Sequence, residues 1–181
     1  AVAADRVEEV LSSQTVIHDP EKPAAFDREQ KGLLRFSHVS FRYPGADENV
    51  LHDITFTAEP GKTTAIIGST GSGKSTLVNL IPRFYDVTEG SITLDGADIR
   101  QVRQHDLREK LGFVPQKGIL FSGDIASNIL FGNPGGSEEE MKEAAEIAQA
   151  VEFIEEKPEG YQSPIAQGGS NVSGGQKQRM S

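Results

Sequence analysis

A stretch rich in glycine and serine, "GSTGSGKST" from Gly68 to Thr76, constrains the fold of this chain more than any other feature. The apolar sequence "TTAIIG" precedes it without alternation between polar and apolar residues and ends at a glycine. A short apolar run of this kind is typical of a central strand that is buried on both faces. A helical pattern follows from about Lys74 into "LVNLI" and meets Pro82. The order of strand, loop and helix predicts a βα unit in an α/β fold.

The loop matches the phosphate-binding P-loop pattern G-x-x-x-x-G-K-[ST] at four positions, Gly68, Gly73, Lys74 and Ser75. Glycines let phosphate oxygens approach the backbone, and the start of the next helix presents unpaired N–H groups. Lys74 can reach the β- and γ-phosphates of a nucleotide, and Ser75 can offer its hydroxyl to Mg²⁺. The alternative is a flexible loop that matches by accident, which average residue usage makes rare, on the order of 0.01 matches in this length. We therefore predict that a bound triphosphate orders this loop.

The predicted contacts with the nucleotide comprise the whole loop: Gly68, Ser69, Thr70, Gly71, Ser72, Gly73, Lys74, Ser75 and Thr76.

The composition excludes several other classes of function. With 181 residues the chain is long enough for one main domain with a core. A net charge of −9 argues against a nucleic-acid partner, because phosphate-backbone binding needs a clustered excess of Lys and Arg. The absence of cysteine excludes disulfides, thiolate metal sites and cysteine nucleophiles. No apolar run approaches the roughly 20 residues of a membrane span, so we expect the chain as given to be soluble.

The N-terminal residues differ in character from the rest. Residues 1–11 place apolar side chains at helical spacing opposite charged ones, which predicts an amphipathic helix. Residues 12–32 are polar, contain two prolines and show no periodicity, so they are predicted to form a linker. The domain proper is predicted over residues 33–181.

Several segments of this domain have strand or helix patterns. Residues 33–43 alternate with one phase slip and residues 53–59 alternate regularly, which predicts an antiparallel pair of half-buried strands. Residues 91–96 read as a strand with a turn. Residues 106–116 read as a short helix that leads into a strand stopped by Pro115.

One further helix has a clear start signal. Ser137 is followed three residues later by Glu140, which is the pattern of a capping box. Apolar residues continue at helical spacing from Met141 to Val151, so a helix is predicted there.

A second glycine cluster, "VSGGQ" from Val172 to Gln176, resembles the signature motif of ABC-type ATPases, which usually has Leu where this chain has Val172. Ser173 and the amides of Gly174 and Gly175 would form a second anion site at a helix N-terminus. The resemblance implies that Ser173, Gly174, Gly175 and Gln176 close on the γ-phosphate of ATP that the P-loop of a partner domain holds. One chain would therefore offer two half-sites, and the partner could be identical or different.

Three further matches stand in the order that this family shows. "FRYPG" places Tyr43 where the family has an aromatic residue that stacks on adenine, although Tyr43 alone would also fit a packed turn aromatic. "FVPQ" places Gln116 where the family has a glutamine near the metal and the attacking water, and in contact with the transport domains. "SPIAQGGSNVSGGQ" resembles the loop before the signature in exporters, with Gln167 where many members have Glu.

The resemblance covers about residues 33–181 and implies a fold and a set of roles. The fold is an α/β P-loop NTPase core with an antiparallel β subdomain and a helical signature subdomain, truncated after the signature motif. Lys74 and Gln116 are implied as catalytic residues, Ser75 and Gln116 as Mg²⁺ ligands, and ATP as the nucleotide. In the family an apolar strand ending in Asp-Glu and a switch histidine follow the signature, and this sequence ends at Ser181 before them. We therefore expect these 181 residues to bind ATP but to hydrolyse little of it.

The resemblance points to an exporter-type ABC transporter, with this domain on the cytoplasmic face of the cell membrane. Residues 1–11 would then be the end of a preceding membrane domain, and the transmembrane domains and a second nucleotide-binding domain would be the partners. Two alternatives stay open. One is a soluble ABC-type ATPase that acts as a mechanical switch in DNA repair or translation, and the other is a subunit that binds ATP without hydrolysing it.

Overall fold

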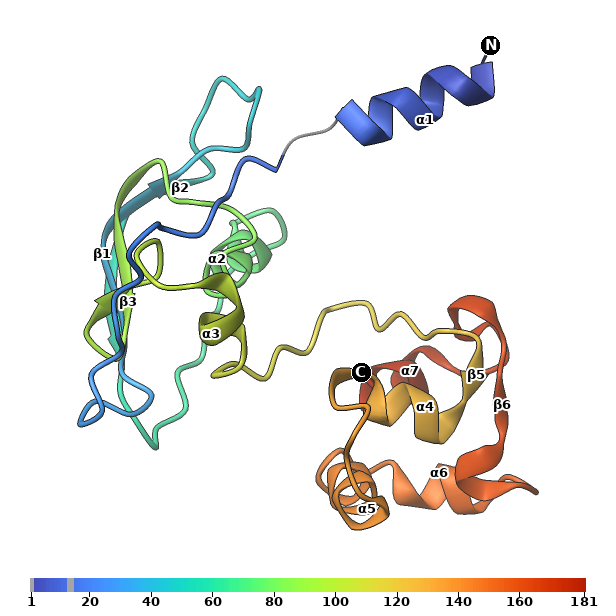
Figure 1. The fold of residues 1–181 in the computed structure, drawn as a ribbon. Helices are drawn as coiled ribbons and strands as arrows, with labels where there is room; N and C mark the ends of the chain where they lie inside the picture. The colour runs from blue at the N-terminus through green and yellow to red at the C-terminus, as the bar shows by residue number, and fades with distance from the viewer. Residues whose placement is uncertain (1, 13–14) are drawn as a thin grey trace. The chain divides into compact units, whose positions relative to one another are not determined.

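A computed structural model describes residues 2–12 and 15–181 of the chain (Figure 1). Ala1 of the predicted helix and residues 13–14 of the predicted linker lie outside the described residues. The chain forms two compact units, Ala1–Gly112 and Phe113–Ser181. No helix in the described part combines the length and the apolar character that a membrane crossing requires.

Helix α1 spans Val2–Ser12, over the range in which the sequence predicts a helix. Three of its apolar side chains, Val7, Val10 and Leu11, are between 58% and 79% exposed. That this helix ends a membrane domain stays a prediction.

Residues 15–33, which include most of the predicted linker at 12–32, form no helix or strand, but hydrogen bonds hold them to the start of α3 (Gln104–Arg108) and to the turn after β3 (Glu89–Leu94). The carboxylate of Asp19 accepts from the backbone N–H of Gln104 at 2.9 Å. This N–H and the Gln104 side chain hold the pKa of Asp19 below its usual value. Further along, the N–H of Gly32 donates to the carboxylate of Asp95 at 2.6 Å. The linker is therefore an ordered strap rather than a free tether.

A four-stranded antiparallel sheet forms the first unit's main layer, in the order β2-β1-β3-β4. Its strands are β1 (Leu34–Phe41), β2 (Leu51–Ala58), β3 (Glu89–Leu94) and β4 (Ala97–Asp98). The predicted antiparallel pairing of the first two strands and the predicted strand at 91–96 are confirmed.

The phase slip predicted in the first strand is a β-bulge. The pairing of β1 with β2 shifts register between Phe36 and Val39, and His38 adopts a positive φ of 50°. Because of the bulge, Phe36, Val39 and Phe41 all point to the buried face.

Two helices pack in the same unit. Helix α2 spans Lys74–Leu80, as predicted, and buries Leu77 and Leu80 in the core formed with the sheet. Helix α3 spans Gln104–Arg108 (Figure 1). It buries Leu107 in the same core.

Two predicted strands are wrong. Residues 63–67, predicted as a central strand buried on both faces, have no strand conformation, and Ile67 is 91% exposed. The segment before Pro115 is likewise not a strand, and Val114 is 62% exposed. A buried strand needs hydrogen-bonded neighbours along its edges, and no described strand pairs with either segment. Their apolar side chains therefore lack the layer that would cover them.

The second unit is mainly helical. Its helices are α4 (Ile125–Ile129), α5 (Glu138–Ile147), α6 (Val151–Glu155) and α7 (Gly174–Arg179), with 3₁₀ turns η1 (Leu130–Gly132), η2 (Gly160–Gln162) and η3 (Gln167–Gly169). A short ladder pairs β5 (Gly123–Asp124) with β6 (Pro164–Ile165). Buried Ile125, Ala150 and Ile154 lie in its core.

The capping box predicted at the start of α5 is confirmed. The N–H of Ser137 donates to the Glu140 carboxylate at 2.8 Å, and the N–H of Glu140 donates to the Ser137 hydroxyl at 3.2 Å. The helix ends at Ile147, earlier than the apolar spacing suggests, because Gln149 adopts a positive φ of 54° before α6 begins at Val151.

Candidate nucleotide site

The glycine-rich loop leads directly into α2, and two of its glycines, Gly71 and Gly73, adopt conformations that other residues avoid. Gly73 is the N-cap of the helix, with a φ of 89°, and makes no side-chain cap. A Cβ atom at Gly73 would lie 2.8 Å from Cδ2 of Leu51. Gly71 has a φ of 83° and open space around it. The start of α2 is therefore bare backbone, which a phosphate oxygen can approach.

Lys74, the first residue of α2, bends back over the loop. Its Nζ donates to the backbone carbonyl of Gly68 at 2.8 Å and to that of Ser69 at 2.7 Å. The ammonium group thus lies where the loop pattern requires a positive charge for phosphate. Phosphate oxygens make stronger, charge-assisted bonds than these neutral carbonyls and would replace them.

The donor set of residues 68–76 fits a Mg²⁺-bound triphosphate. It combines the lysine ammonium with the hydroxyl groups of Ser69, Thr70, Ser72, Ser75 and Thr76, and it contains no carboxylate that would repel the phosphates. Ser75 is exposed in the first turn of α2, where its hydroxyl can reach a magnesium ion held by the phosphates.

The structure brings Tyr43 to this loop. Its ring packs edge to face against Phe41, with centroids 4.9 Å apart, and against Tyr85, with centroids 5.2 Å apart. The hydroxyl groups of Tyr43 and Thr76 lie 2.9 Å apart and share a hydrogen bond. The predicted base-stacking residue is therefore attached to the helix that carries the predicted phosphate site.

The predicted signature residues lie in the second unit, at the start of α7. Ser173 is the N-cap, and its hydroxyl accepts from the N–H of Gln176 at 3.2 Å while the Gln176 side chain accepts from the N–H of Ser173 at 3.0 Å. Gly174 and Gly175 are exposed, and no atom lies within 4 Å of a Cβ built on either. Their surroundings are open, and Val172 packs against the core of this unit.

Gln116 is also in the second unit and is exposed. Each unit is a separate body, with Tyr43 and residues 68–76 in the first and Gln116 and Ser173–Gln176 in the second. A magnesium site shared by Ser75 and Gln116 therefore stays a prediction.

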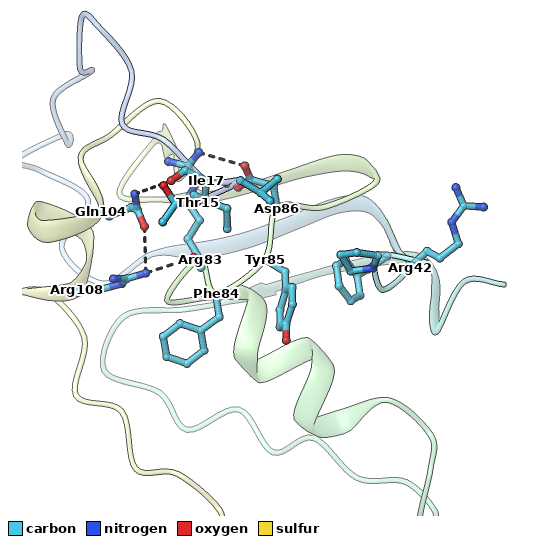
Figure 2. A pocket seen from close by; sticks show the side chains of 12 residues that line it. Thr15, Ile17, Arg42, Arg83, Phe84, Tyr85, Asp86, Gln104 and Arg108 are labelled. Carbon is cyan, nitrogen blue, oxygen red and sulfur yellow. Dashed lines mark hydrogen bonds and ion pairs between the residues drawn. The ribbon is translucent and has the colours of Figure 1, made fainter. Parts of the chain in front are cut away.

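The sequence reasoning missed a buried arginine and a cavity beside it. Arg83 is 4% exposed, and its guanidinium donates to Asp86 at 2.7 Å and to the backbone carbonyl of His18 at 3.3 Å. Figure 2 shows these side chains at a cavity of about 480 Å³ between the strap, the end of β1 and α3. In the same view, Arg108 reaches Gln104. The sequence signal is an Arg and an Asp three residues apart just after α2.

The comparisons with known proteins agree on one family. The family model described as "ABC transporter" matches residues 51–181. An uncharacterized ABC transporter ATP-binding protein of Mycobacterium tuberculosis is 47% identical over 185 residues, which cover 99% of this chain and 31% of that protein. A protein of Bacillus subtilis, whose name assigns it provisionally to multidrug export as an ATP-binding/permease protein, is 46% identical over 178 residues, which cover 98% of this chain and 30% of its own.

Among solved structures, a bacterial Atm1-family ABC exporter with ATP bound is similar to this chain with a TM-score of 0.88 and 37% identity. The match covers 99% of this chain and 31% of that one. The predicted fold class is therefore confirmed, although residues 63–67 are not a strand here. The chain spans about a third of the length of the relatives it matches. Because the family model covers most of the sequence and the relatives match almost all of it, the chain belongs to the ABC transporter family.

Proposed function

We propose that this chain is the ATP-binding domain of an exporter that couples ATP binding and hydrolysis to transport across a membrane. The observation that carries the proposal is the loop of residues 68–76, in which Lys74 lies over a bare helix start. The names of the relatives, a multidrug export protein and an Atm1-family exporter, support the exporter type. No observation on the described residues favours a soluble switch in DNA repair or translation.

Three residues of the first unit have definite tasks in this proposal. Bound Mg²⁺-ATP supplies the γ-phosphoryl group that water attacks. Lys74 offsets the charge of the β- and γ-phosphates, and the Ser75 hydroxyl holds the magnesium ion. Tyr43 offers its ring to the adenine base. Catalysis of this kind consists mostly of positioning and charge stabilisation, for which a rigid loop is required.

The second unit supplies the contact with a partner. The exposed amides of Gly174 and Gly175 and the Ser173 cap face solvent at the start of α7, so they are available to ATP held by a second nucleotide-binding domain. We infer that two such domains close head to tail on ATP and reopen after hydrolysis, with Gln116 reporting the nucleotide state to the transmembrane domains. The exposed apolar side chains of α1 support a helix that packs against such a membrane domain. We infer that the chain lies on the cytoplasmic face of the membrane.

Residues 1–181 by themselves should bind ATP and turn it over slowly. Residues 177–181, which follow the signature-like stretch, contain no carboxylate side chain that could act as a base for the attacking water. An unpositioned water leaves a large barrier, whatever the charge on the phosphates.

The test uses the full-length protein in lipid vesicles, with ATP hydrolysis and ATP-dependent efflux of a multidrug-type dye as readouts. Ser173→Arg places a bulky charge at the start of α7, and we expect it to keep ATP binding but lose hydrolysis and efflux. Lys74→Ala is the matched variant, which should lose binding as well. Efflux that survives both substitutions would contradict the proposal.

A further inference from the structure

The phosphate loop and the aromatic residue beside it are joined by a contact that neither motif specifies. The hydroxyl of Tyr43, in the loop after β1, lies 2.9 Å from Oγ1 of Thr76. Thr76 stands in the first turn of α2, two residues after Lys74, and is 7% exposed. A hydrogen bond between a partly buried pair this far apart in sequence fixes the loop after β1 to the helix that carries the phosphate site.

Packing alone does not account for the hydroxyl. The ring of Tyr43 meets Phe41 at an interplanar angle of 80° and Tyr85 at 89°, and a phenylalanine would keep both of these contacts. These neighbours constrain the tilt of the ring. The hydrogen bond to Thr76 restrains the hydroxyl end of the ring. The ring therefore cannot rotate about the Cα–Cβ bond of Tyr43 without breaking this hydrogen bond.

We propose that Thr76 is a positioning residue for Tyr43, because its hydroxyl holds the aromatic ring at a fixed place relative to the phosphate loop. The pair would set the distance between base and phosphates that the site accepts. This inference rests on the proposed function, in which Tyr43 stacks on the base and residues 68–76 bind the phosphates. The bond should therefore strengthen binding of a ligand that has both parts, but not of a phosphate chain alone.

The test compares ATP with inorganic tripolyphosphate, each with Mg²⁺, on the 181-residue chain and on Tyr43→Phe, Thr76→Val and the double variant. We expect each single substitution to weaken ATP binding by about three- to tenfold, the scale of one hydrogen bond. Tripolyphosphate affinity of Tyr43→Phe, which leaves the hydroxyl groups of the loop in place, should change by less than about twofold on the same scale. The double variant should bind ATP no more weakly than Thr76→Val, because the same bond is removed only once.

Two variants separate positioning from a merely structural role. Thr76→Ser keeps a hydroxyl at this position and should restore the ratio of ATP affinity to tripolyphosphate affinity. Tyr85→Phe removes a tyrosine hydroxyl from the same aromatic cluster and should leave that ratio unchanged. A purely structural role would lower the melting temperature without changing the ratio. If Thr76→Val does not fold, Tyr43→Phe against Tyr85→Phe decides the question.

Three results would overturn the inference: unchanged ATP affinity in Tyr43→Phe, additive losses of ATP affinity in the double variant, or a loss of affinity in Tyr43→Phe that is as large for tripolyphosphate as for ATP. If the unaltered chain binds both ligands through Lys74 while one of these results is found, the positioning role fails and the proposed function stands. If the unaltered chain shows no binding that depends on Lys74, both fail together.

Discussion

Gly73 shows how closely single residues constrain the site. It caps α2 with a φ of 89°, and its neighbour Leu51 is buried in the core of the sheet. Because Gly73 has no side chain, the helix start is bare for a phosphate. Leu51 leaves no room for a side chain at this position. A residue at this position serves the fold and the site at once.

Replacement of this glycine should destabilise the first unit more than replacement of its neighbour in the loop. Gly71→Ala introduces a side chain at a φ of 83° with open space around it, and should lower the free energy of unfolding by about 1–2 kcal/mol. Gly73→Ala has the same backbone strain and also a Cβ 2.8 Å from Leu51, so it should cost about 1–3 kcal/mol more. Urea unfolding measures both. Equal losses would show that the contact with Leu51 relaxes freely.

At the scale of elements, the strap of residues 15–33 is held to the sheet and to α3. Asp95, at the turn between β3 and β4, is 2% exposed. It accepts from the N–H groups of Gly32 and Leu33 and pairs with Lys110 at 2.9 Å. One buried carboxylate thus joins the strap, the sheet and the segment after α3.

We expect Asp95→Ala to destabilise the first unit and to release the strap. Asp53→Ala is a matched control, because Asp53 has the same φ of 48° but a side chain that is 74% exposed. Because the buried hydrogen bonds are lost, the free energy of unfolding in urea should be about 1–3 kcal/mol lower for Asp95→Ala than for Asp53→Ala. Limited proteolysis should cut residues 15–33 faster in Asp95→Ala alone. Similar cleavage of both variants would mean that Asp95 does not hold the strap.

The elements also show which parts of the fold can be predicted from the sequence. The phase slip at His38 and the capping box at Ser137 rest on local patterns, and each has its counterpart in the structure. The central strand at residues 63–67 depends on neighbours that no local pattern specifies, and it is absent. The candidate site divides in the same way. The loop of residues 68–76 could be predicted because it has a motif, whereas contacts outside the motifs could not.

Contacts between residues that are distant in the sequence could not be predicted from it. The bond from Tyr43 to Thr76 spans 33 positions, and the cavity beside Arg83 combines the strap, the end of β1 and α3. Spacing within a motif carries no information about such contacts, because they depend on how the elements pack.

At the scale of the whole molecule, the chain keeps its two groups of predicted ATP contacts in separate units. Residues 68–76 and Tyr43 belong to the first unit, and the start of α7 belongs to the second. The chain carries a net charge of −9, and the ammonium group of Lys74 donates to the backbone carbonyls of Gly68 and Ser69. We therefore expect phosphate binding to be a local property of the first unit and not to require the partner domain.

The most direct test is a calorimetric titration of the 181-residue chain with ATP and Mg²⁺, with Lys74→Ala as the control. We predict saturable binding at one site per chain. Removal of the charge-assisted bonds in Lys74→Ala should weaken it by about tenfold or more. The absence of saturable binding, or equal affinity in the two proteins, would contradict the claim that residues 68–76 form the nucleotide site.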